Sequence, residues 1–271
     1  MILQVIMSKT YRVHALVTLV VLAVSVMGCS KFRYEKPLTW HLVLQVDPAT
    51  PDLESAVATT VALLERRLDL VGVHDFKVTV QQPVSNGRIE VNLPSTRDPQ
   101  RMKDFLTAGG KLEIVHVIGP PSPAPPSTYD NEAAANTIAK NVANARVLPY
   151  IPMPEEKKWA VVEVPSIIKG TDLRNANALP GADRGDEYHI GFTLKPDGAS
   201  KLSSWTGANI NQYVGIVLNN ELRSIAFIKS QISDSGGISG GFTKQSAEDL
   251  AQILNSGPLP APIRIIEERN N

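Results

Sequence analysis

The sequence lacks the residues on which disulfide-bonded and thiolate-metal proteins depend. Its 271 residues include a single cysteine, Cys29, so neither an intrachain disulfide nor a cluster of thiolate metal ligands can form. An excess of charge of one sign is also missing, because 27 basic residues balance 27 acidic residues. A basic surface of the kind that binds nucleic acid is not indicated, and no nucleic-acid partner is expected.

Motifs of known catalytic chemistry are equally scarce. No G-x-x-x-x-G-K-[ST] phosphate loop occurs, and residues 237–241 (GISGG) match the G-x-S-x-G nucleophile elbow of α/β-hydrolases only in letters. That fold places its catalytic histidine after the serine, whereas all five histidines precede Ser239: His14, His41, His74, His116 and His189. The histidines also lack metal-ligand spacing, so the sequence predicts no enzyme, no cofactor and no metal site. The glycines are interpreted as a turn.

The N-terminus has the pattern of a signal peptide. Lys9 and Arg12 precede an apolar run at residues 15–26, which is shorter than the roughly 20 residues that span a bilayer as a helix. Residues 26–29 (VMGC) resemble a bacterial lipobox, so we predict a signal peptide at residues 1–28, lipid attachment at Cys29 and a tether at residues 29–37. An uncleaved N-terminal helix is the alternative anchor, and the choice between inner and outer membrane stays open.

Periodicity between residues 38 and 118 predicts an α+β arrangement. A strand at 41–47 is followed by a helix with an apolar stripe at Leu53, Val57 and Leu64, and then by strands at 76–80 and 88–93. Asp98 caps a second helix, and a further strand follows at 112–118. The order strand-helix-strand-strand-helix-strand is that of the ferredoxin-like fold. We therefore expect a ferredoxin-like base.

The rest of the chain predicts an inserted α+β head subdomain and a return to the base. Prolines dominate residues 119–127, and the head is assigned to residues 119–242, of which 119–158 are proline-rich and variable. Thr243 caps a last helix that Gly257 ends, and a strand begins at Ile263. The base is accordingly assigned to residues 38–118 and 243–269.

Several segments, in this order, resemble the first periplasmic (P1) domain of SecD, in the SecDF protein-export accessory complex. Those nearest the C-terminus read GGFT at 240–243, AEDLA at 247–251, LPAP at 259–262 and IIEER at 265–269. Earlier ones read HLVLQVD at 41–47, LERR at 64–67 and RIEVNLP at 88–94. The resemblance runs from about residue 38 to residue 269.

The resemblance implies a stand-alone, lipoprotein-like chain with SecD-like function. It would be a non-enzymatic protein on the periplasmic side of the cell envelope that binds polypeptides exported through the Sec translocon or assists their release. Its implied partners are unfolded preprotein, the membrane through its anchor, and the Sec translocon or a separate SecDF-type membrane subunit. The alternative is an envelope lipoprotein that reuses the P1 fold as a binding or structural module unrelated to export.

Three aromatic residues in the head are candidates for contact with a polypeptide. Phe192, Trp205 and Tyr213 lie in or beside predicted strands and a predicted helix, and a ferredoxin-like sheet also offers an edge strand to an extended peptide. The alternative for each ring is a place in the hydrophobic core.

Overall fold

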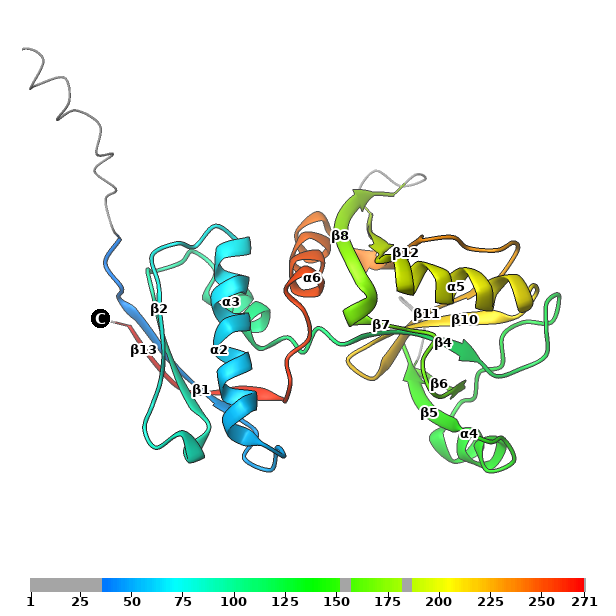
Figure 1. Cartoon of the computed structure of the whole chain (residues 1–271), viewed down its shortest axis with the longest axis horizontal. Helices are drawn as coiled ribbons and strands as arrows, with labels where there is room; N and C mark the ends of the chain where they lie inside the picture. Colours follow the sequence, from blue (N-terminus) through cyan, green and yellow to red (C-terminus); the bar gives the residue numbers. More distant parts are fainter. Residues whose placement is uncertain (1–35, 152–156, 182–186, 271) are drawn as a thin grey trace, which may run out of the picture. The chain divides into compact units, whose positions relative to one another are not determined.

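Three β-sheets and five helices of eight or more residues make up the part of the chain that the computed structural model describes, residues 36–151, 157–181 and 187–270 (Figure 1). The predicted α+β class is confirmed. Cys29, the predicted signal peptide and all of the tether before residue 36 lie outside the described residues. From Leu38 onward the chain clusters as one unit.

The first sheet has four strands, all antiparallel to their neighbours. Its order in space is β13 (Ile263–Asn270), β1 (Trp40–Val46), β3 (Arg88–Leu93) and β2 (Lys77–Val80). Helix α2 (Leu53–Leu70) contacts three of these strands, and α3 (Pro99–Thr107) contacts β13. A short 3₁₀ turn, η1 (Val84–Asn86), lies between β2 and β3.

Alternation along β1 builds the core of this sheet. Trp40, Leu42 and Leu44 are at most 1% exposed and pack with Leu64 and Leu68 of α2. One face of the sheet is thus buried by apolar side chains, as the period of two in β1 and the helical stripe of α2 predict.

The predicted strand at 112–118 forms but does not close this sheet. As β4 (Leu112–Val117), it pairs instead with β6, β7 and β10, and the place beside β1 belongs to β13, with Trp40 opposite Asn270 and Val46 opposite Ile263. The burial patterns of β4 and β13 explain why β13, and not β4, pairs with β1. β4 is buried on both faces, whereas β13 is half-buried or exposed throughout, as suits a strand at the edge of a sheet that is open on one side.

The second sheet closes into a ring of five strands, β4-β10-β11-β5-β6, with β7 as an extra strand on β4. Val115, Val117, Val162 and Leu222 pack together as one of its buried clusters. Asn219 and Asn220, both with positive φ, make the tight turn between β10 and β11. The other elements are α4 (Glu132–Ala139), β5 (Ala145–Tyr150), β6 (Lys158–Glu163), β7 (Ile168–Lys169), β10 (Tyr213–Leu218) and β11 (Glu221–Phe227).

A buried ion pair lies between two strands of this ring. Arg146 of β5 donates to Glu113 of β4 at 3.1 Å, and the Lys111 ammonium lies 3.5 Å from the same carboxylate oxygen. Burial by itself raises the pKa of Glu113, but the hydrogen bond and positive charge of Arg146, helped by Lys111, bring the pKa below its ordinary value.

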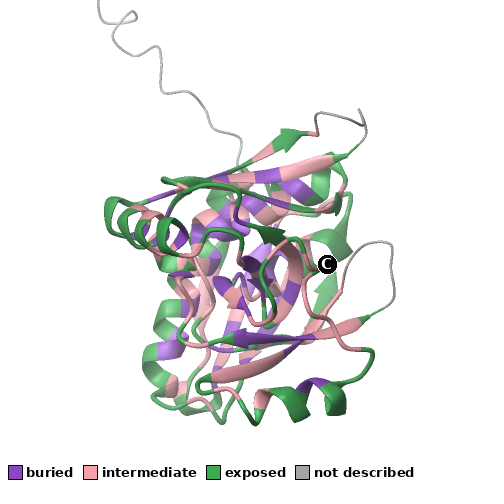
Figure 2. Ribbon diagram, turned by 90° about the vertical axis from the view of Figure 1, so that its right-hand side faces the viewer, coloured by how far each residue is buried: buried purple, intermediate pink, exposed green. Residues whose placement is uncertain are grey.

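The third sheet, in the order β12-β9-β8, shares a core with two helices. Its strands are β8 (Leu173–Pro180), β9 (Tyr188–Leu194) and β12 (Ser235–Phe242). The two helices are α5 (Pro196–Ala208) and α6 (Lys244–Ser256), and a short 3₁₀ turn, η2 (Gly170–Asp172), precedes β8. Their buried side chains meet the outward face of β4 and β10 in one cluster. In Figure 2 buried positions lie mostly in the interior of the ribbon, and many outer turns and helix faces are exposed.

Glycine permits the close approach of β12 to β9, because a Cβ at Gly236 would lie 2.6 Å from the Phe192 ring. The glycine-rich segment is thus a strand up to Phe242, where we expected a turn.

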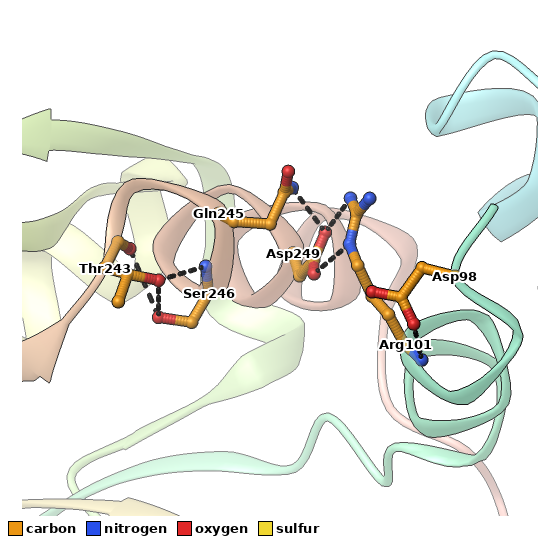
Figure 3. Close-up of polar contacts among 6 residues, drawn as sticks. All are labelled: Asp98, Arg101, Thr243, Gln245, Ser246 and Asp249. Carbon is orange, nitrogen blue, oxygen red and sulfur yellow. Dashed lines mark hydrogen bonds and ion pairs between the residues drawn. The ribbon is translucent and has the colours of Figure 1, made fainter.

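Helix α6 begins and ends as predicted but packs differently. The Thr243 hydroxyl accepts a hydrogen bond from the backbone N–H of Ser246 at 3.2 Å (Figure 3). Gly257 follows the last turn. Its buried residues Ala247 and Ala251 lie in the core shared with β8 and β9. The sequence-based boundaries at 118 and 243 therefore divide elements that share one core.

The side chain of Asn255, in the last turn of α6, pairs with β8 as a strand would. Its amide nitrogen donates to the carbonyl of Ala176 at 2.9 Å, and its amide oxygen accepts from the N–H of Ala176 at 2.8 Å.

Two polar contacts join α6 to the helices of the four-stranded sheet. Arg101 of α3 makes a two-pronged ion pair with Asp249 of α6, at 2.7 and 2.8 Å (Figure 3). Arg67 of α2 is fully buried, and it donates to Leu106 O at 2.8 Å, Phe105 O at 3.2 Å and Ser256 Oγ at 3.1 Å. Burial lowers the pKa of Arg67 to about 10.

Candidate functional site

A surface groove of about 500 Å³ lies between the end of β4, the segment after β6, and α5. It combines an aromatic wall with polar groups that face one another, which is the usual composition of a binding site. The residues that line it are His116, Glu163, Pro165, Ser166, Ile167, Lys201, Ser204 and Trp205.

Strand alternation places His116 at the groove. Leu112, Ile114 and His116 share one face of β4, and the first two are buried in the core beneath α5. The strand therefore presents His116 on the same side, just beyond the core. The opposite wall is fixed by the backbone N–H of Ile167, which donates to Ile114 O at 2.8 Å.

Helical spacing places Trp205. Leu202 and Thr206 of α5 are buried, and Trp205, between them in sequence, is half-buried against the same core. The Thr206 hydroxyl accepts a hydrogen bond from the N–H of Ile232 at 2.9 Å, which ties α5 to the loop before β12. The indole is thus held on a rigid helix with part of its ring facing the groove.

A carboxylate and an indole hold the His116 ring. Nδ1 lies 2.9 Å from a carboxylate oxygen of Glu163, and the ring centroid lies 5.2 Å from that of Trp205 at an angle of 55°. Because an ionised carboxylate only accepts hydrogen bonds, Nδ1 carries the hydrogen and donates it. The Glu163 carboxylate thereby fixes both the orientation of the ring and its tautomer.

Two polar atoms at the groove have no hydrogen-bond partner among the residues that the structure describes. They are Nε2 of His116 and the hydroxyl oxygen of Ser166, and both are buried from solvent. Most buried polar atoms in proteins are paired, so these two atoms are exceptions, but neither is exposed to a ligand lying in the groove.

The three predicted contact residues are not brought together. Phe192 is 4% exposed and lies in the core under α5 and α6, whereas Tyr213 is 8% exposed, lies in the cluster within the five-stranded ring and donates to Ala124 O at 2.6 Å. Trp205 lines the groove. The described packing thus gives the core to Phe192 and Tyr213 and leaves Trp205 as the candidate contact.

Sequence reasoning missed His116, Glu163 and Ser166 as a group. They lie in β4, at the end of β6 and in the following loop, and no local spacing joins them. The pairing of Val117 with Val162 sets the neighbouring His116 and Glu163 opposite each other, but this follows from strand pairing that the sequence did not reveal.

Other features of the described residues bear on the sequence-based expectations. Ser239 is an exposed residue within β12, which differs from the strand-to-helix turn of a nucleophile elbow. In the ranges described, no three His, Cys, Asp or Glu side chains are placed to hold a metal ion. Among those same residues, no helix combines the length and apolar character needed to cross a membrane.

Residues 145–261, which include most of the groove, match the family model of the SecDF P1 head subdomain. The chain is related to SecD. It is 35% identical over 218 residues to protein translocase subunit SecD of Koribacter versatilis, covering 80% of this chain and 39% of that protein. It is 32% identical over 216 residues to SecD of Aquifex aeolicus, covering 80% and 40%. The chain thus spans about two fifths of the length of these relatives.

Solved SecDF structures are similar in fold. One, a SecDF described as a membrane component that enhances protein export, matches with a TM-score of 0.60 and 25% identity, covering 84% of this chain and 98% of that one. A crystal structure of SecDF in the super-membrane-facing form matches with a TM-score of 0.64 and 23% identity, covering 88% and 32%. The predicted resemblance to the SecDF P1 region is confirmed.

Proposed function

We propose that this chain is a non-enzymatic SecD-type P1 region that binds polypeptides during Sec-dependent export and assists their release on the periplasmic side of the membrane. The observation that carries the proposal is the match of residues 145–261 to the SecDF P1 head subdomain. The groove beside Trp205, most of which lies on that subdomain, supports it with a surface where a ligand would contact Trp205 and Ile167. The proposed partners are unfolded preprotein and the Sec translocon or a SecDF-type membrane subunit.

We further propose a division of this region into base and head. The base consists of β1, α2, β2, β3, α3 and β13, whose antiparallel order β13-β1-β3-β2 is consistent with a ferredoxin-like fold. The head is the insertion from β4 to α6, because these elements share their cores with one another. The connection from α3 to β13 thereby carries the whole binding subdomain.

Site-specific crosslinking tests the binding function. A photoreactive residue in place of Ser204, at the groove, is expected to crosslink to a secretory preprotein arrested during export. The matched control replaces Glu65, an exposed residue of α2, with the same photoreactive residue and is expected to give at most about a third as much product. Equal crosslinking from both positions, or none from either, would contradict a polypeptide-binding role for the groove.

The anchor is a separate proposal, carried by the VMGC sequence at residues 26–29. We propose that Cys29 is lipidated and attaches the chain to the periplasmic face of a membrane. Intact-mass analysis of wild-type protein is expected to show cleavage before Cys29 and added acyl mass, both of which Cys29→Ser abolishes. An uncleaved chain with no added mass in the wild type would replace the lipid with an N-terminal helical anchor.

A further inference from the structure

One carboxylate at the groove has no cationic side chain beside it. The Glu163 side chain is 48% exposed, its Oε2 accepts from Nδ1 of His116 at 2.9 Å, and its Oε1 has no hydrogen-bond partner in the described ranges. A second proton on His116 would lie on Nε2, which is buried without an acceptor in that part of the chain, so the neutral ring leaves the charge of Glu163 uncompensated. Lys201, on the α5 side of the groove, already pairs with Asp172 at 3.2 Å. A ligand that brings a positive charge to Glu163 is therefore favoured.

The surface beside this carboxylate suits the stem of a long side chain. Trp205, Ile167 and Pro165 line the groove, and the Trp205 ring centroid lies 5.2 Å from that of His116. Because His116 is also hydrogen-bonded to Glu163, a single imidazole separates the indole from the carboxylate. Basic side chains lay their methylene groups along apolar surface of this kind while the charged head reaches a polar group at its edge.

An apolar side chain would match the groove less well. It would make the same contact with Trp205, but it would remove water from the Glu163 carboxylate without supplying a donor. A guanidinium supplies donors for the carboxylate and also stacks on aromatic rings. The combination of one indole and one unpaired carboxylate thus distinguishes a basic ligand from an apolar one.

We infer that the groove binds a basic side chain of an extended polypeptide, with its methylene groups against Ile167 and Trp205 and its cationic head donating to Glu163. This inference rests on the proposed function and names the class of side chain that the site selects. The recognition depends on exposed parts of the groove and needs no change in the buried atoms beneath it.

The test uses the full chain and a pair of labelled synthetic peptides. One is a capped, unstructured nonapeptide of Gly and Ser with a central Arg, and the other has citrulline at that position, which keeps the shape of Arg but carries no charge. Fluorescence anisotropy is expected to show about three- to five-fold tighter binding of the Arg peptide, as one exposed ion pair with an aromatic contact predicts. Because the carboxylate is exposed, added salt is expected to reduce this preference.

Two variants separate the roles of charge and apolar contact. Glu163→Gln keeps the shape of the side chain and is expected to bring the preference for Arg over citrulline below about two-fold, whereas the matched control Glu65→Gln, which alters an exposed carboxylate of α2, leaves the preference unchanged. Trp205→Leu is expected to weaken both peptides at least two-fold, because both stems lie against the indole.

The outcomes distinguish the inference from the proposed function. Equal binding of the two peptides to wild type, a preference that survives Glu163→Gln, or affinities that Trp205→Leu leaves unchanged would overturn recognition of a basic side chain here while leaving polypeptide binding intact. Absence of binding by either peptide also overturns the inference, and the proposed function fails with it only if Ser204 gives no crosslink to preprotein.

Discussion

Replacing Arg67 by Met is expected to be among the most destabilising single changes in this region. The side chain is fully buried, and three of its hydrogen bonds, at 2.8 to 3.2 Å, reach Ser256 Oγ and the carbonyls of Phe105 and Leu106. Those carbonyls belong to the last turn of α3, where a helix has no internal donors left. Methionine fills a similar volume without a donor, so both carbonyls would lose their Arg67 hydrogen bonds.

The magnitude follows from two opposing effects. Hydrogen bonds from a charged donor contribute about 1.5–3 kcal/mol each, so three contribute about 4.5–9 kcal/mol. Burial of the charge lowers the pKa of Arg67 to about 10, a cost of roughly 3 kcal/mol that the variant avoids. The free energy of unfolding is therefore expected to fall by about 2–6 kcal/mol.

Urea unfolding followed by tryptophan fluorescence measures this loss, because Trp40 is buried in the core that α2 covers. The matched control is Arg66→Met on the same helix, where the side chain is exposed and a change within about 0.5 kcal/mol is expected. If the Arg67 and Arg66 variants unfold at the same urea concentration with equal slopes, the buried guanidinium does not stabilise the fold.

Two other interactions give measurable expectations. A double-mutant cycle on Arg101→Ala and Asp249→Ala should give a coupling of about 0.5–1 kcal/mol that decreases with added salt, because the pair is partly exposed; a salt-independent coupling would contradict a Coulombic origin. For Glu113, the lowered folded-state pKa means that its stabilising effect is present above the ordinary glutamate pKa and is lost as the pH falls through the lowered value. Between about pH 5 and pH 3, wild type should lose more stability than Glu113→Gln, and parallel losses in acid urea titrations would refute this.

Local signals in the sequence predicted most helices and turns. Asp98 and Thr243 cap α3 and α6 as expected, and Asn219-Asn220 makes the tight turn. These features depend on hydrogen bonds and backbone angles within a few residues, so they can be read from the sequence.

Partnerships between distant strands were not predictable in the same way. β4 and β13 both have the pattern of a strand in the sequence, and period alone does not say which one pairs with β1. The glycine-rich β12 was missed because glycine has a low strand propensity. Here the close packing of Gly236 on Phe192, which a larger residue would prevent, outweighs that propensity. The groove could not be predicted for the same reason, since its position depends on where β4, β6 and α5 meet.

The pairing of Asn255 with Ala176 has a consequence for how the protein meets other chains. An open sheet edge can add a strand from any extended polypeptide that meets it. At β8, a single side-chain amide from α6 already supplies the donor and acceptor that a foreign strand would offer at Ala176. At Ala176 the edge of β8 is thus occupied by a side chain from a helix, and protection of this position from another strand depends on the last turn of α6 remaining helical.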